Sequence, residues 1–574
     1  MKPWWERFPG RLDREIASLD SNGIAYKQDE LAWRQGQLVL DLKVTPPGGE
    51  AIQLIAHYPQ QFPYTRFEVV APNLLLPRHQ NPFAKNLCLM GRASSNWSVH
   101  DTLGDVLMEQ LPKLMRFARE NPATLRDLEE PQGEPITDFY DYYPNTAVLV
   151  DSSWQLDLAV SSGRLKLSYS GAQPFRGAVT EVLDSDGRTI AHAGAALDRA
   201  FTQSARGHWV RWDAPIVETD VKRLIGIVSA RYRNFGQMAL STKRALERGH
   251  PEIRGIVFPE EGEQGKFHDA WLFLVRTVGR WYLARSCRAG RGDLGSRAPE
   301  LAALLGKRVT AIGLGSVGAP CAIELARSGV SLLKLVDYDF MEAGTSSRWP
   351  LGLSAVGRPK VDALGDFIAQ NYPYTQVERF HGMVGRSQRV PAPYYCDSRD
   401  FDGLLETDLV LDATAEPGIQ LLLSHFAAER GIPYICASTT PGAWGGLVFR
   451  QLPGTEHACW SCLQHAMTEG LVPTPLHYPQ GTLQPAGCAS PTFTGAGVDI
   501  QLVSLMAART AIATLCVGAE NGYPDVDWNV AIATFRSSEG RIVAPQWEVT
   551  TIARHANCRN SHAHRDDLDT RKAA

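Results

Sequence analysis

The residues whose spacing is most informative are three glycines, Gly313, Gly315 and Gly318, in the sequence Gly-Leu-Gly-Ser-Val-Gly. They follow an apolar run (residues 309–312) and precede a helical pattern with Pro320 in its first turn. Glycines at this spacing let the backbone approach a phosphate, and the following helix N-terminus offers N–H groups and a positive dipole. The motif predicts a nucleotide site, although the same pattern occurs in NAD and FAD sites and in purely structural turns.

Acidic and basic residues follow the glycines in a definite order. A second buried strand, residues 332–336, is expected to deliver Asp337 and Asp339 to its carboxyl end, where a doubly wound sheet holds its ligand. Arg348 and Lys360 come next. Two cations brought to one nucleotide suit a triphosphate, whose charge builds up in a transition state. This order favours ATP over NAD, and the alternative for the two cations is a solvated helix face.

This ordered series resembles the adenylating domain of the ubiquitin-activating superfamily, which includes the thiamine- and molybdopterin-biosynthesis adenylating enzymes. The family's pattern is GxGxxG, Asp-x-Asp, Asn-x-x-Arg and a later lysine. The resemblance implies ATP and Mg²⁺ as ligands. It also implies that Asp337 holds the ribose, and that Arg348 and Lys360 hold phosphates.

Two positions depart from the family pattern. Thr345 stands where the family has asparagine, and Ala415 stands where it has the acidic residue that binds magnesium. Asp412 or Glu416 would then substitute, or the metal would be held differently.

The family also places an arginine from before the glycine turn in a partner subunit's ATP site. Arg291 and Arg297 are candidates for that role, with a basic linker as the alternative.

A second reactive centre is predicted near the N-terminus, where His79, Gln80 and Asn81 precede Cys88, and Trp97 follows. A thioester-forming cysteine must be exposed and rigidly held, and its thiolate is the reactive form. The Asn81 amide could donate a hydrogen bond to the oxyanion formed when an amine attacks. Because Cys88 lies between two leucines, the alternative is a buried structural cysteine.

The elements expected around Cys88 are one helix, a strand meander, an irregular stretch and a long amphipathic helix. This order and the motif resemble a ubiquitin-conjugating domain over about the first 130 residues, with glutamine replacing the family's proline in His-Pro-Asn. The predicted ranges are 4–19 (helix), 37–44, 51–57 and 66–70 (strands) and 103–119 (helix).

The middle of the chain, residues 135–298, shows no catalytic constellation and is predicted to be a β-rich connecting domain. Its predicted strands are 148–158, 164–169, 209–212, 223–228 and 270–283, with a helix at 238–247.

A Cys-x-x-Cys pair, Cys459 and Cys462, means a redox pair or half of a tetrahedral zinc site. The adenylating family often completes a zinc site with a second cysteine pair near its C-terminus, where this chain has Cys558, His562 and His564. The resemblance therefore implies structural zinc on Cys459, Cys462, Cys558 and either His562 or His564. A degenerate site without metal is the alternative.

Cys488 lies in a Gly- and Pro-rich stretch, residues 481–491, just before a helix predicted over 498–516. The family carries a catalytic cysteine on a loop before such a helix, which makes Cys488 the candidate. A thiol near a helix N-terminus can have a lowered pKa. The alternative is an incidental loop thiol.

Length and composition set the frame for these sites. A chain of 574 residues has room for three or four domains of ~150 residues. The sequence predicts an α/β multidomain protein. Its parts are an N-terminal α+β ubiquitin-conjugating-like domain (1–132), a β-rich linker domain (135–298), a doubly wound, Rossmann-like adenylating domain (299–565) and a tail (566–574).

With 44% hydrophobic and 21% charged residues the composition is that of an ordinary globular protein. A net charge of -4 gives no reason to expect nucleic-acid binding, and no apolar run reaches the ~20 residues of a membrane span. The ten cysteines are scattered rather than arranged as a disulfide framework, which favours the reducing cytoplasm.

A conjugating-like domain, a β-rich linker and an adenylating domain, in this order, resemble the bacterial fusion enzymes of the cyclic-oligonucleotide-based anti-phage signalling system (CBASS). The resemblance implies adenylation of the C-terminus of a cGAS/DncV-like nucleotidyltransferase, transfer from Cys488 to Cys88 as a thioester, and conjugation to an amine of a target protein or small molecule. It also implies a homodimer. A sulfur-carrier adenylyltransferase, a noncatalytic nucleotide-binding scaffold and an NAD oxidoreductase are the alternatives.

Overall fold

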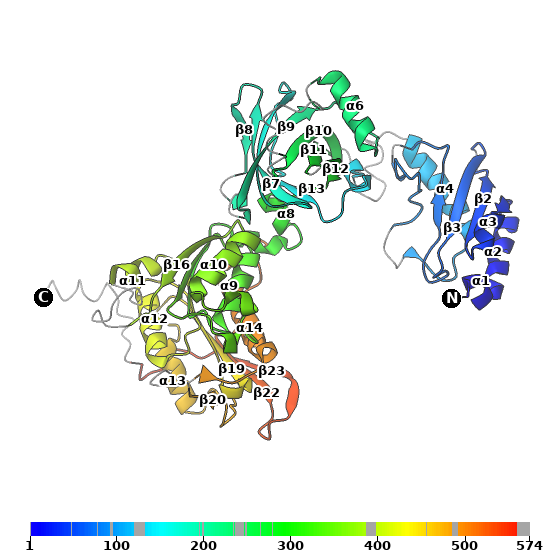
Figure 1. Ribbon diagram of the computed structural model, residues 1–574. Helices are drawn as coiled ribbons and strands as arrows, with labels where there is room; N and C mark the ends of the chain where they lie inside the picture. The colour runs from blue at the N-terminus through cyan, green and yellow to red at the C-terminus, as the bar shows by residue number, and fades with distance from the viewer. Residues whose placement is uncertain are drawn as a thin grey trace. The chain divides into compact units, whose positions relative to one another are not determined.

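The computed structural model describes the chain except at residues 1, 47–48, 77, 92–95, 120–132, 194–195, 198–199, 234, 236–245, 247–248, 264–265, 278, 386–397, 455, 485–491 and 559–574. The chain divides into two compact units (Figure 1). The first comprises Met1–Ala193 and Gln203–Arg288, and the second comprises Gly194–Thr202 and Ala289–Ala574.

The N-terminal domain of the first unit, residues 2–119, is a four-stranded antiparallel sheet with helices packed beside it. The strands hydrogen-bond in their chain order, and β2 alternates buried and exposed side chains, so one face of the sheet is turned to the core. The elements are α1 (Trp4–Arg7), α2 (Pro9–Ser21), β1 (Ala25–Gln28), α3 (Glu30–Arg34), β2 (Leu38–Val44), β3 (Ile52–Tyr58), β4 (Glu68–Val70) and α4 (Leu103–Arg119).

The predicted elements occur in the predicted order, and α4 has the predicted bounds. The predicted helix over residues 4–19 is interrupted at Phe8, because α2 begins at Pro9, which has no N–H to continue α1. β1 and α3 are additional to the prediction. The side chains of β1 are exposed or half-buried, so its sequence carries no alternation that would identify a strand.

Helices α2 and α4 approach closely at Gly104, where a Cβ atom would lie 2.6 Å from the Ser18 carbonyl oxygen. The hydroxyls of Ser18 and Thr102 share a hydrogen bond of 2.7 Å. Glu15, which is fully buried on α2, accepts hydrogen bonds from the Tyr58 hydroxyl (2.7 Å) and the Leu103 N–H (3.0 Å). These bonds satisfy the N-terminus of α4 and fix it against α2.

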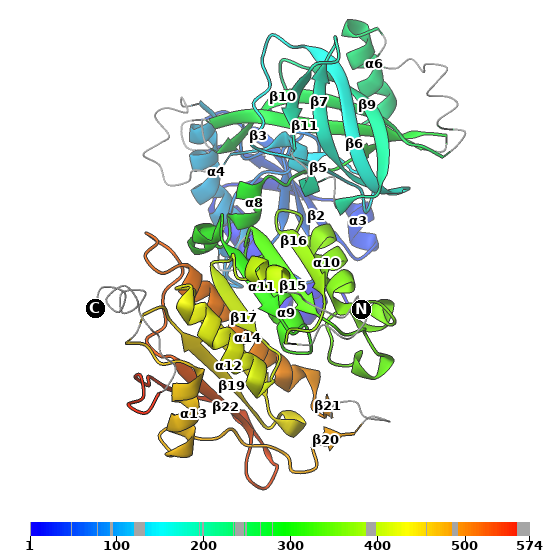
Figure 2. The ribbon, with the colours of Figure 1, turned by 90° about the vertical axis from the view of Figure 1, so that its left-hand side faces the viewer.

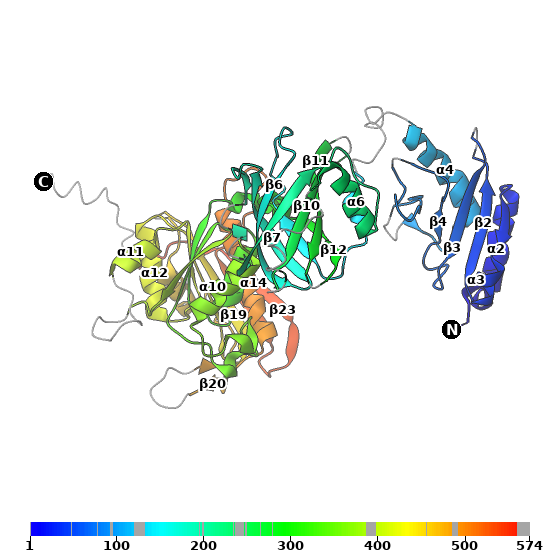
Figure 3. The ribbon, with the colours of Figure 1, turned by 45° about the horizontal axis from the view of Figure 1, so that its top comes forward.

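The β-rich domain, residues 133–193 and 203–288, is a nine-stranded sheet in the order β12-β11-β10-β9-β6-β7-β5-β13, with β8 paired to β7. Figure 3 shows α6 beside this sheet, and α6 contacts β12. The elements are β5 (Ala147–Val150), β6 (Ser162–Ala172), β7 (Phe175–Asp184), β8 (Thr189–His192), β9 (Gln203–Arg211), α6 (Val221–Arg231), β10 (Glu252–Glu263), β11 (Lys266–Arg276), β12 (Trp281–Ala284) and β13 (Ser286–Arg288).

The β-rich character is as predicted, but the strand predicted at residues 223–228 is wrong. That stretch lies inside α6, which begins after Asp220, whose carboxylate accepts a hydrogen bond of 2.8 Å from the Arg223 N–H. Leu224 and Val228, four residues apart, are the buried positions. The strand predicted at 148–158 ends at Val150, and the helix predicted at 238–247 lies almost wholly outside the described residues.

The second unit contains a doubly wound α/β domain, residues 289–558 (Figure 2). Its sheet has the order β16-β15-β14-β17-β18-β19-β22-β23, with parallel pairing from β16 to β18 and antiparallel pairing beyond. The strands are β14 (Arg308–Ile312), β15 (Leu332–Asp337), β16 (Gln376–His381), β17 (Leu409–Asp412), β18 (Tyr434–Thr439), β19 (Gly445–Gln451), β22 (Val530–Arg536) and β23 (Ile542–Thr550). The other elements are α8 (Arg291–Gly295), α9 (Gly318–Arg327), α10 (Lys360–Asn371), α11 (Ser398–Leu404), α12 (Pro417–Glu429), α13 (Trp460–Thr468), α14 (Gly497–Leu515) and the short strands β20 (Thr482–Leu483) and β21 (Thr492–Phe493).

Both faces of this sheet are covered by helices. Val309 and Ala311 of β14 belong to one core with α9, α10 and α14, whereas Ile312 belongs to a second core with α11, α12 and α13. β14 lies between β15 and β17. The strands that follow it in the sequence are therefore placed on both sides of it, β15 and β16 on one side and β17 and β18 on the other. The carboxyl ends of β14 and β17 form the topological switch point, where open α/β sheets bind ligands. The predicted Rossmann-like fold is confirmed.

Among the described residues, α14 is the one helix long and apolar enough to cross a membrane by length and composition. It is mostly buried inside the domain, where it contacts α9, β18 and β19. We therefore interpret α14 as a core helix.

Candidate nucleotide and thiol sites

The glycine turn lies at the switch point, and the three glycines have different reasons to be glycine. Gly313 has a φ of 83°, and a Cβ atom there would lie 2.8 Å from the Ala413 carbonyl carbon. A Cβ at Gly318 would overlap the Gly313 carbonyl oxygen. A Cβ at Gly315 would meet nothing within 4 Å. The outer glycines are thus required by the fold, whereas Gly315 faces open space where a ligand could approach.

Asp337 fixes the glycine turn to the end of β15. One carboxylate oxygen accepts a hydrogen bond of 2.6 Å from the Leu314 N–H, and the other accepts one of 2.8 Å from the Asp339 N–H. The side chain is buried, and burial raises its pKa, against the lowering effect of Lys360 and these two bonds. Trp349, which the sequence reasoning missed, donates a hydrogen bond of 2.8 Å from Nε1 to the Leu314 carbonyl.

Asp339 and Lys360 form an ion pair at the same edge, with Nζ 2.7 Å from Oδ2. The Lys360 side chain is only 12% exposed, and that of Asp339 is 51% exposed. Lys360 is the first residue of α10. The structure therefore brings Asp337, Asp339 and Lys360 together, as the sequence predicts, beside the turn that holds Gly315.

Arg348 has contacts within its own chain. Its guanidinium donates hydrogen bonds to the Phe493 carbonyl and, at 3.1 Å, to the Thr492 hydroxyl, and it lies 4.6 Å from the centroid of the Phe493 ring. Burial lowers its pKa. Thr345 donates its hydroxyl to the Glu342 carbonyl at 2.8 Å, so it caps a local turn. We call the end of the sheet that carries the glycine turn, Asp337, Asp339 and Lys360 the nucleotide edge. Arg348 connects this edge to β21.

Asp412 is completely buried, and both of its carboxylate oxygens accept hydrogen bonds from the protein. Oδ1 accepts from the Thr414 N–H (2.9 Å) and hydroxyl (2.7 Å), and Oδ2 accepts from the Tyr434 hydroxyl (2.8 Å). Burial raises the pKa of Asp412. Ala415 has a φ of 57°, and Glu416, which follows, is exposed at the start of α12. The arrangement leaves Glu416, rather than Asp412, as the acidic side chain accessible to a ligand.

Cys459, Cys462 and Cys558 form a thiol cluster, as the sequence predicts. Their Sγ atoms lie within 4.8 Å of one another, with separations of 3.7 Å from Cys459 to Cys462 and 3.5 Å from Cys459 to Cys558. These distances exceed a disulfide bond and approach the ~3.8 Å edge of a tetrahedron with Zn–S bonds of about 2.3 Å. The donor set fits zinc; the predicted fourth ligand, His562 or His564, lies outside the described residues.

The two thiols of the Cys-x-x-Cys pair are not equivalent. The hydrogen bond between the first two thiols raises the pKa of Cys459 and lowers that of Cys462. The His555 N–H donates to the Cys462 Sγ at 3.3 Å, and the His555 ring stacks on His465 with centroids 4.4 Å apart. Sequence reasoning missed His555, whose role depends on a contact across 93 residues of chain.

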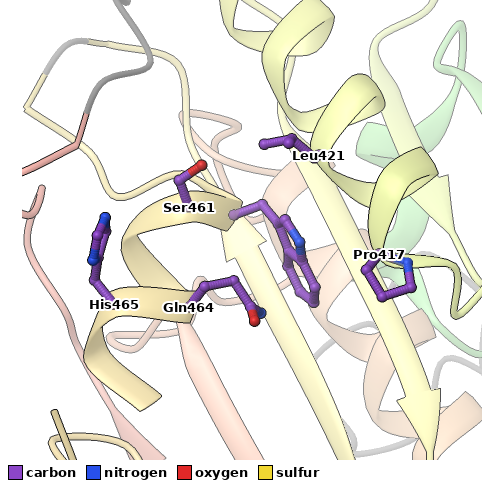
Figure 4. Close-up of a pocket in the computed structure, with 6 residues that line it drawn as sticks. Pro417, Leu421, Ser461, Gln464 and His465 are labelled. Carbon is purple, nitrogen blue, oxygen red and sulfur yellow. The ribbon is translucent and has the colours of Figure 1, made fainter. Parts of the chain in front are cut away.

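A surface pocket of about 310 Å³ is lined by residues of α12 and α13. Figure 4 shows Ser461, Gln464 and His465 on one side and Pro417 and Leu421 on the other. The pocket thus joins α12, which begins after Glu416, to α13, which carries Cys462.

In the N-terminal domain, Cys88 is exposed, with Sγ 3.7 Å from the Met90 carbonyl oxygen. Asn81 accepts hydrogen bonds of 2.9 Å from the N–H groups of Phe83 and Ala84, so its side-chain carbonyl orders the loop before Cys88. The exposed position is consistent with a reactive thiol and argues against the buried alternative.

Gln80, at the proline position of the motif, is buried. Its amide donates hydrogen bonds to the Leu74 carbonyl (2.9 Å) and the Ala71 carbonyl (3.2 Å), and its carbonyl accepts one from the Leu76 N–H (2.8 Å). Trp97 donates from Nε1 to the Pro63 carbonyl at 2.8 Å and is half-buried. Both residues have a packing role.

Two further predictions concern other parts of the chain. Cys488 lies outside the described residues. Arg291 donates hydrogen bonds to the Ser331 hydroxyl (3.1 Å) and the Tyr374 carbonyl (3.4 Å), so it is held by its own domain, while Arg297 is exposed.

Comparison with known proteins agrees with this geometry. Residues 293–559 match the ThiF family. The protein y4oA of Sinorhizobium fredii (strain NBRC 101917 / NGR234) is 31% identical over 585 residues, covering 97% of each chain. The present chain belongs to the same family as y4oA and carries a ThiF-family domain in its C-terminal region.

More limited matches concern this domain. The adenylyltransferase and sulfurtransferase uba4 of Emericella nidulans is 31% identical over 163 residues, which cover 27% of this chain and 31% of that protein. The probable adenylyltransferase/sulfurtransferase MoeZ of Mycobacterium tuberculosis is 30% identical over 132 residues, covering 23% and 31%. A crystal structure of E. coli MccB matches with a TM-score of 0.35 and 15% identity, covering 47% of this chain and 72% of that one.

Proposed function

We propose that this protein adenylates the C-terminal carboxylate of a partner protein with ATP and transfers the acyl group through two of its own cysteines to an amine. The observation that carries the first step is the meeting of an open glycine turn with Asp337, Asp339 and Lys360 at the switch point of the sheet. The ThiF match and the names of the relatives as adenylyltransferases support the same reaction class.

In the adenylation step, a carboxylate oxygen of the partner attacks the α-phosphorus of ATP. The bond from that phosphorus to the bridging oxygen breaks, and pyrophosphate leaves. The N–H groups around Gly315 face the phosphates, Asp337 accepts the ribose hydroxyls, and Lys360 balances phosphate charge. Arg348 joins them when it exchanges its contacts with Thr492 and Phe493 for phosphate oxygens.

Magnesium fits the oxygen donors at this edge. Asp339 is half exposed and Glu416 is exposed, whereas both oxygens of Asp412 are already hydrogen-bonded within the fold. We assign Asp339 and Glu416 as the residues that would hold Mg²⁺, which neutralises phosphate charge when bound. Asp412 shapes the turn that presents Glu416.

The relay then preserves the activation of the acyl group. The Cys488 thiolate attacks the acyl adenylate and AMP leaves; the Cys88 thiolate attacks that thioester and releases Cys488. An amine finally attacks the Cys88 thioester, forms an amide and releases the Cys88 thiolate, while the amine proton goes to solvent. Asn81 stabilises the oxyanion of that last step.

The order of the three domains supports a role in CBASS anti-phage defence. The acyl donor is then the C-terminus of a cGAS/DncV-like nucleotidyltransferase, and the acceptor is an amine of a target protein or a small molecule. The enzyme works in the cytoplasm as a homodimer, with structural zinc on Cys459, Cys462, Cys558 and either His562 or His564.

Mass spectrometry of the protein mixed with its donor, ATP and Mg²⁺ tests the relay. We expect a thiol-labile acyl adduct on Cys488 in the Cys88→Ala variant, and none on Cys88 in the Cys488→Ala variant. Isotope exchange between ATP and pyrophosphate, measured on the same samples, reports adenylation alone.

The two measurements together distinguish adenylation from thioester transfer. Exchange without an adduct on either cysteine would contradict the relay and leave an adenylyltransferase of the sulfur-carrier kind. Absence of exchange with a donor that binds would leave a noncatalytic scaffold.

A further inference from the structure

Side chains of the β-rich domain contact the loop that precedes Cys88. Arg78 forms an ion pair with Glu261 of β10, and both side chains are largely buried. The Phe83 ring packs on the Tyr140 ring, with centroids 5.0 Å apart. The loop therefore does not rest on the N-terminal domain alone, and the β-rich domain is more than a spacer.

A third contact leads directly to Cys88. The two carboxylate oxygens of Glu134 lie 2.6 and 2.7 Å from the backbone nitrogen of His79, and Oε1 lies 3.1 Å from Nδ1 of the same residue. The carbonyl of His79 in turn accepts a hydrogen bond of 2.7 Å from the Cys88 N–H. One peptide segment thus connects Glu134 to the backbone of Cys88.

The backbone of His79 explains why a carboxylate is needed there. His79 has a φ of 59°, a left-handed conformation that is uncommon for residues with a Cβ and that persists only where its surroundings hold it. A hydrogen bond from an N–H to a charged acceptor is about twice as strong as one between neutral groups. Glu134 supplies that acceptor.

We propose that Glu134 is a positioning residue for Cys88, which holds the left-handed His79 backbone and through it the thiol. This inference rests on the proposed role of Cys88 as the acyl carrier. Without Glu134 the loop relaxes, the thiol becomes more accessible to small reagents, and the thioester loses its fixed orientation toward the attacking amine.

The first test uses the full-length protein without ATP or donor, so it does not depend on the proposed reaction. The rate of Cys88 alkylation by iodoacetamide is followed by peptide mass spectrometry. We expect Glu134→Ala to raise this rate about tenfold, because a loop that has lost this anchor opens locally more often and lets a small reagent reach the thiol. The half-buried thiol of Cys287, which belongs to the same compact unit as Cys88, reports unfolding of that unit, and Glu109→Ala, in an exposed ion pair on α4, is the matched control.

A rate equal to that of wild type would overturn the proposal. If the alanine variant also speeds alkylation of Cys287, Glu134→Gln decides instead, since it keeps an acceptor for the His79 N–H but loses the charge. A faster Cys88 reaction in Glu134→Gln, with Cys287 reacting as slowly as in wild type, supports the proposal; an unchanged rate contradicts it.

The second test measures single-turnover discharge of the Cys88 thioester to an amine. We expect Glu134→Ala to lower the maximal rate about tenfold and to leave the half-saturating amine concentration unchanged. A change in that concentration alone would overturn the positioning role. Absence of any Cys88 thioester in wild type would count against the proposed function, and the alkylation result would still decide whether Glu134 positions the thiol.

Discussion

Among single residues, Asp412 shows how an acidic side chain at the end of a strand can serve the fold rather than the ligand. Its sequence position, four residues into a buried strand that leads to the nucleotide edge, makes it a reasonable metal candidate. That prediction could not include Tyr434, which comes from the next strand and donates its hydroxyl to Asp412. The completely buried carboxylate is left with no accessible oxygen for a metal.

The raised pKa of Asp412 gives a pH-dependent prediction. The folded domain binds the Asp412 proton more tightly than the unfolded chain, so this residue's contribution to stability falls as pH rises from the ordinary value of 3.8 through the raised value. We therefore expect Asp412→Asn to lower the melting temperature of the ThiF domain more at about pH 4.5 than at about pH 8. Calorimetry of both proteins at both pH values measures this difference. A cost that grows with pH would contradict the assignment.

For Arg348, the role that its sequence position predicts differs from the contacts that the structure shows. Its spacing from Asp337 predicts a phosphate ligand, whereas the structure places its guanidinium on Thr492 and Phe493. Both observations hold if the side chain exchanges partners when ATP binds.

We expect Arg348→Lys to slow ATP-pyrophosphate exchange about a hundredfold, because lysine cannot reproduce a planar, bidentate contact with phosphate. Thr492→Val, which removes one partner of Arg348 without touching the phosphates, is the matched control and should retain exchange. Equal loss in the two variants would show that Arg348 acts through β21 and not on ATP.

At the scale of elements, the sequence predicted strongly patterned segments well and weakly patterned ones poorly. The bounds of α4 agree with the prediction because its apolar residues recur with clear helical periodicity. Residues 223–228 were predicted as a strand because their apolar content is high, while the Asp220 cap that starts α6 is a weaker signal. β1 has no buried face to reveal it.

The thiol cluster links elements that are far apart in sequence. Cys459 and Cys462 lie at the start of α13, and Cys558 follows β23. A metal held there would close a loop of about a hundred residues, which stabilises the folded state by restricting the unfolded chain.

We expect about one zinc per chain, and we expect Cys558→Ser to lower both the zinc content and the melting temperature of the ThiF domain, since structural zinc contributes directly to folding. Elemental mass spectrometry and calorimetry measure the two quantities. Cys287→Ser, a half-buried thiol of the β-rich domain, is the control and should keep the metal. Equal zinc in both variants would rule out the cluster as the site.

At the scale of the whole molecule, the two halves of the proposed reaction, adenylation and the final transfer from Cys88, belong to different compact units. The nucleotide edge belongs to the second unit, and Cys88 with Glu134 belongs to the first. Motif spacing predicts the candidate residues of each half, because each motif lies within a short segment of the sequence. It could not predict Glu134, whose partner is 55 residues away and whose sequence neighbourhood carries no motif.

This division predicts that ATP stabilises one unit only. A ligand at a hundred times its Kd adds about 2.7 kcal/mol to the unit that binds it, which raises the melting temperature of a unit of this size by a few degrees. We expect ATP with Mg²⁺ to raise the melting temperature of the unit with Ala289–Ala574 and to leave that of the unit with Gln203–Arg288 unchanged. Hydrogen exchange followed by peptide mass spectrometry during thermal unfolding assigns each transition to its unit.

Lys360→Ala should lose most of the ATP-dependent shift, because it removes a phosphate contact while leaving the fold of α10 intact. An equal shift of both units would mean that ATP couples them, and the nucleotide site would then have to extend beyond the ThiF domain.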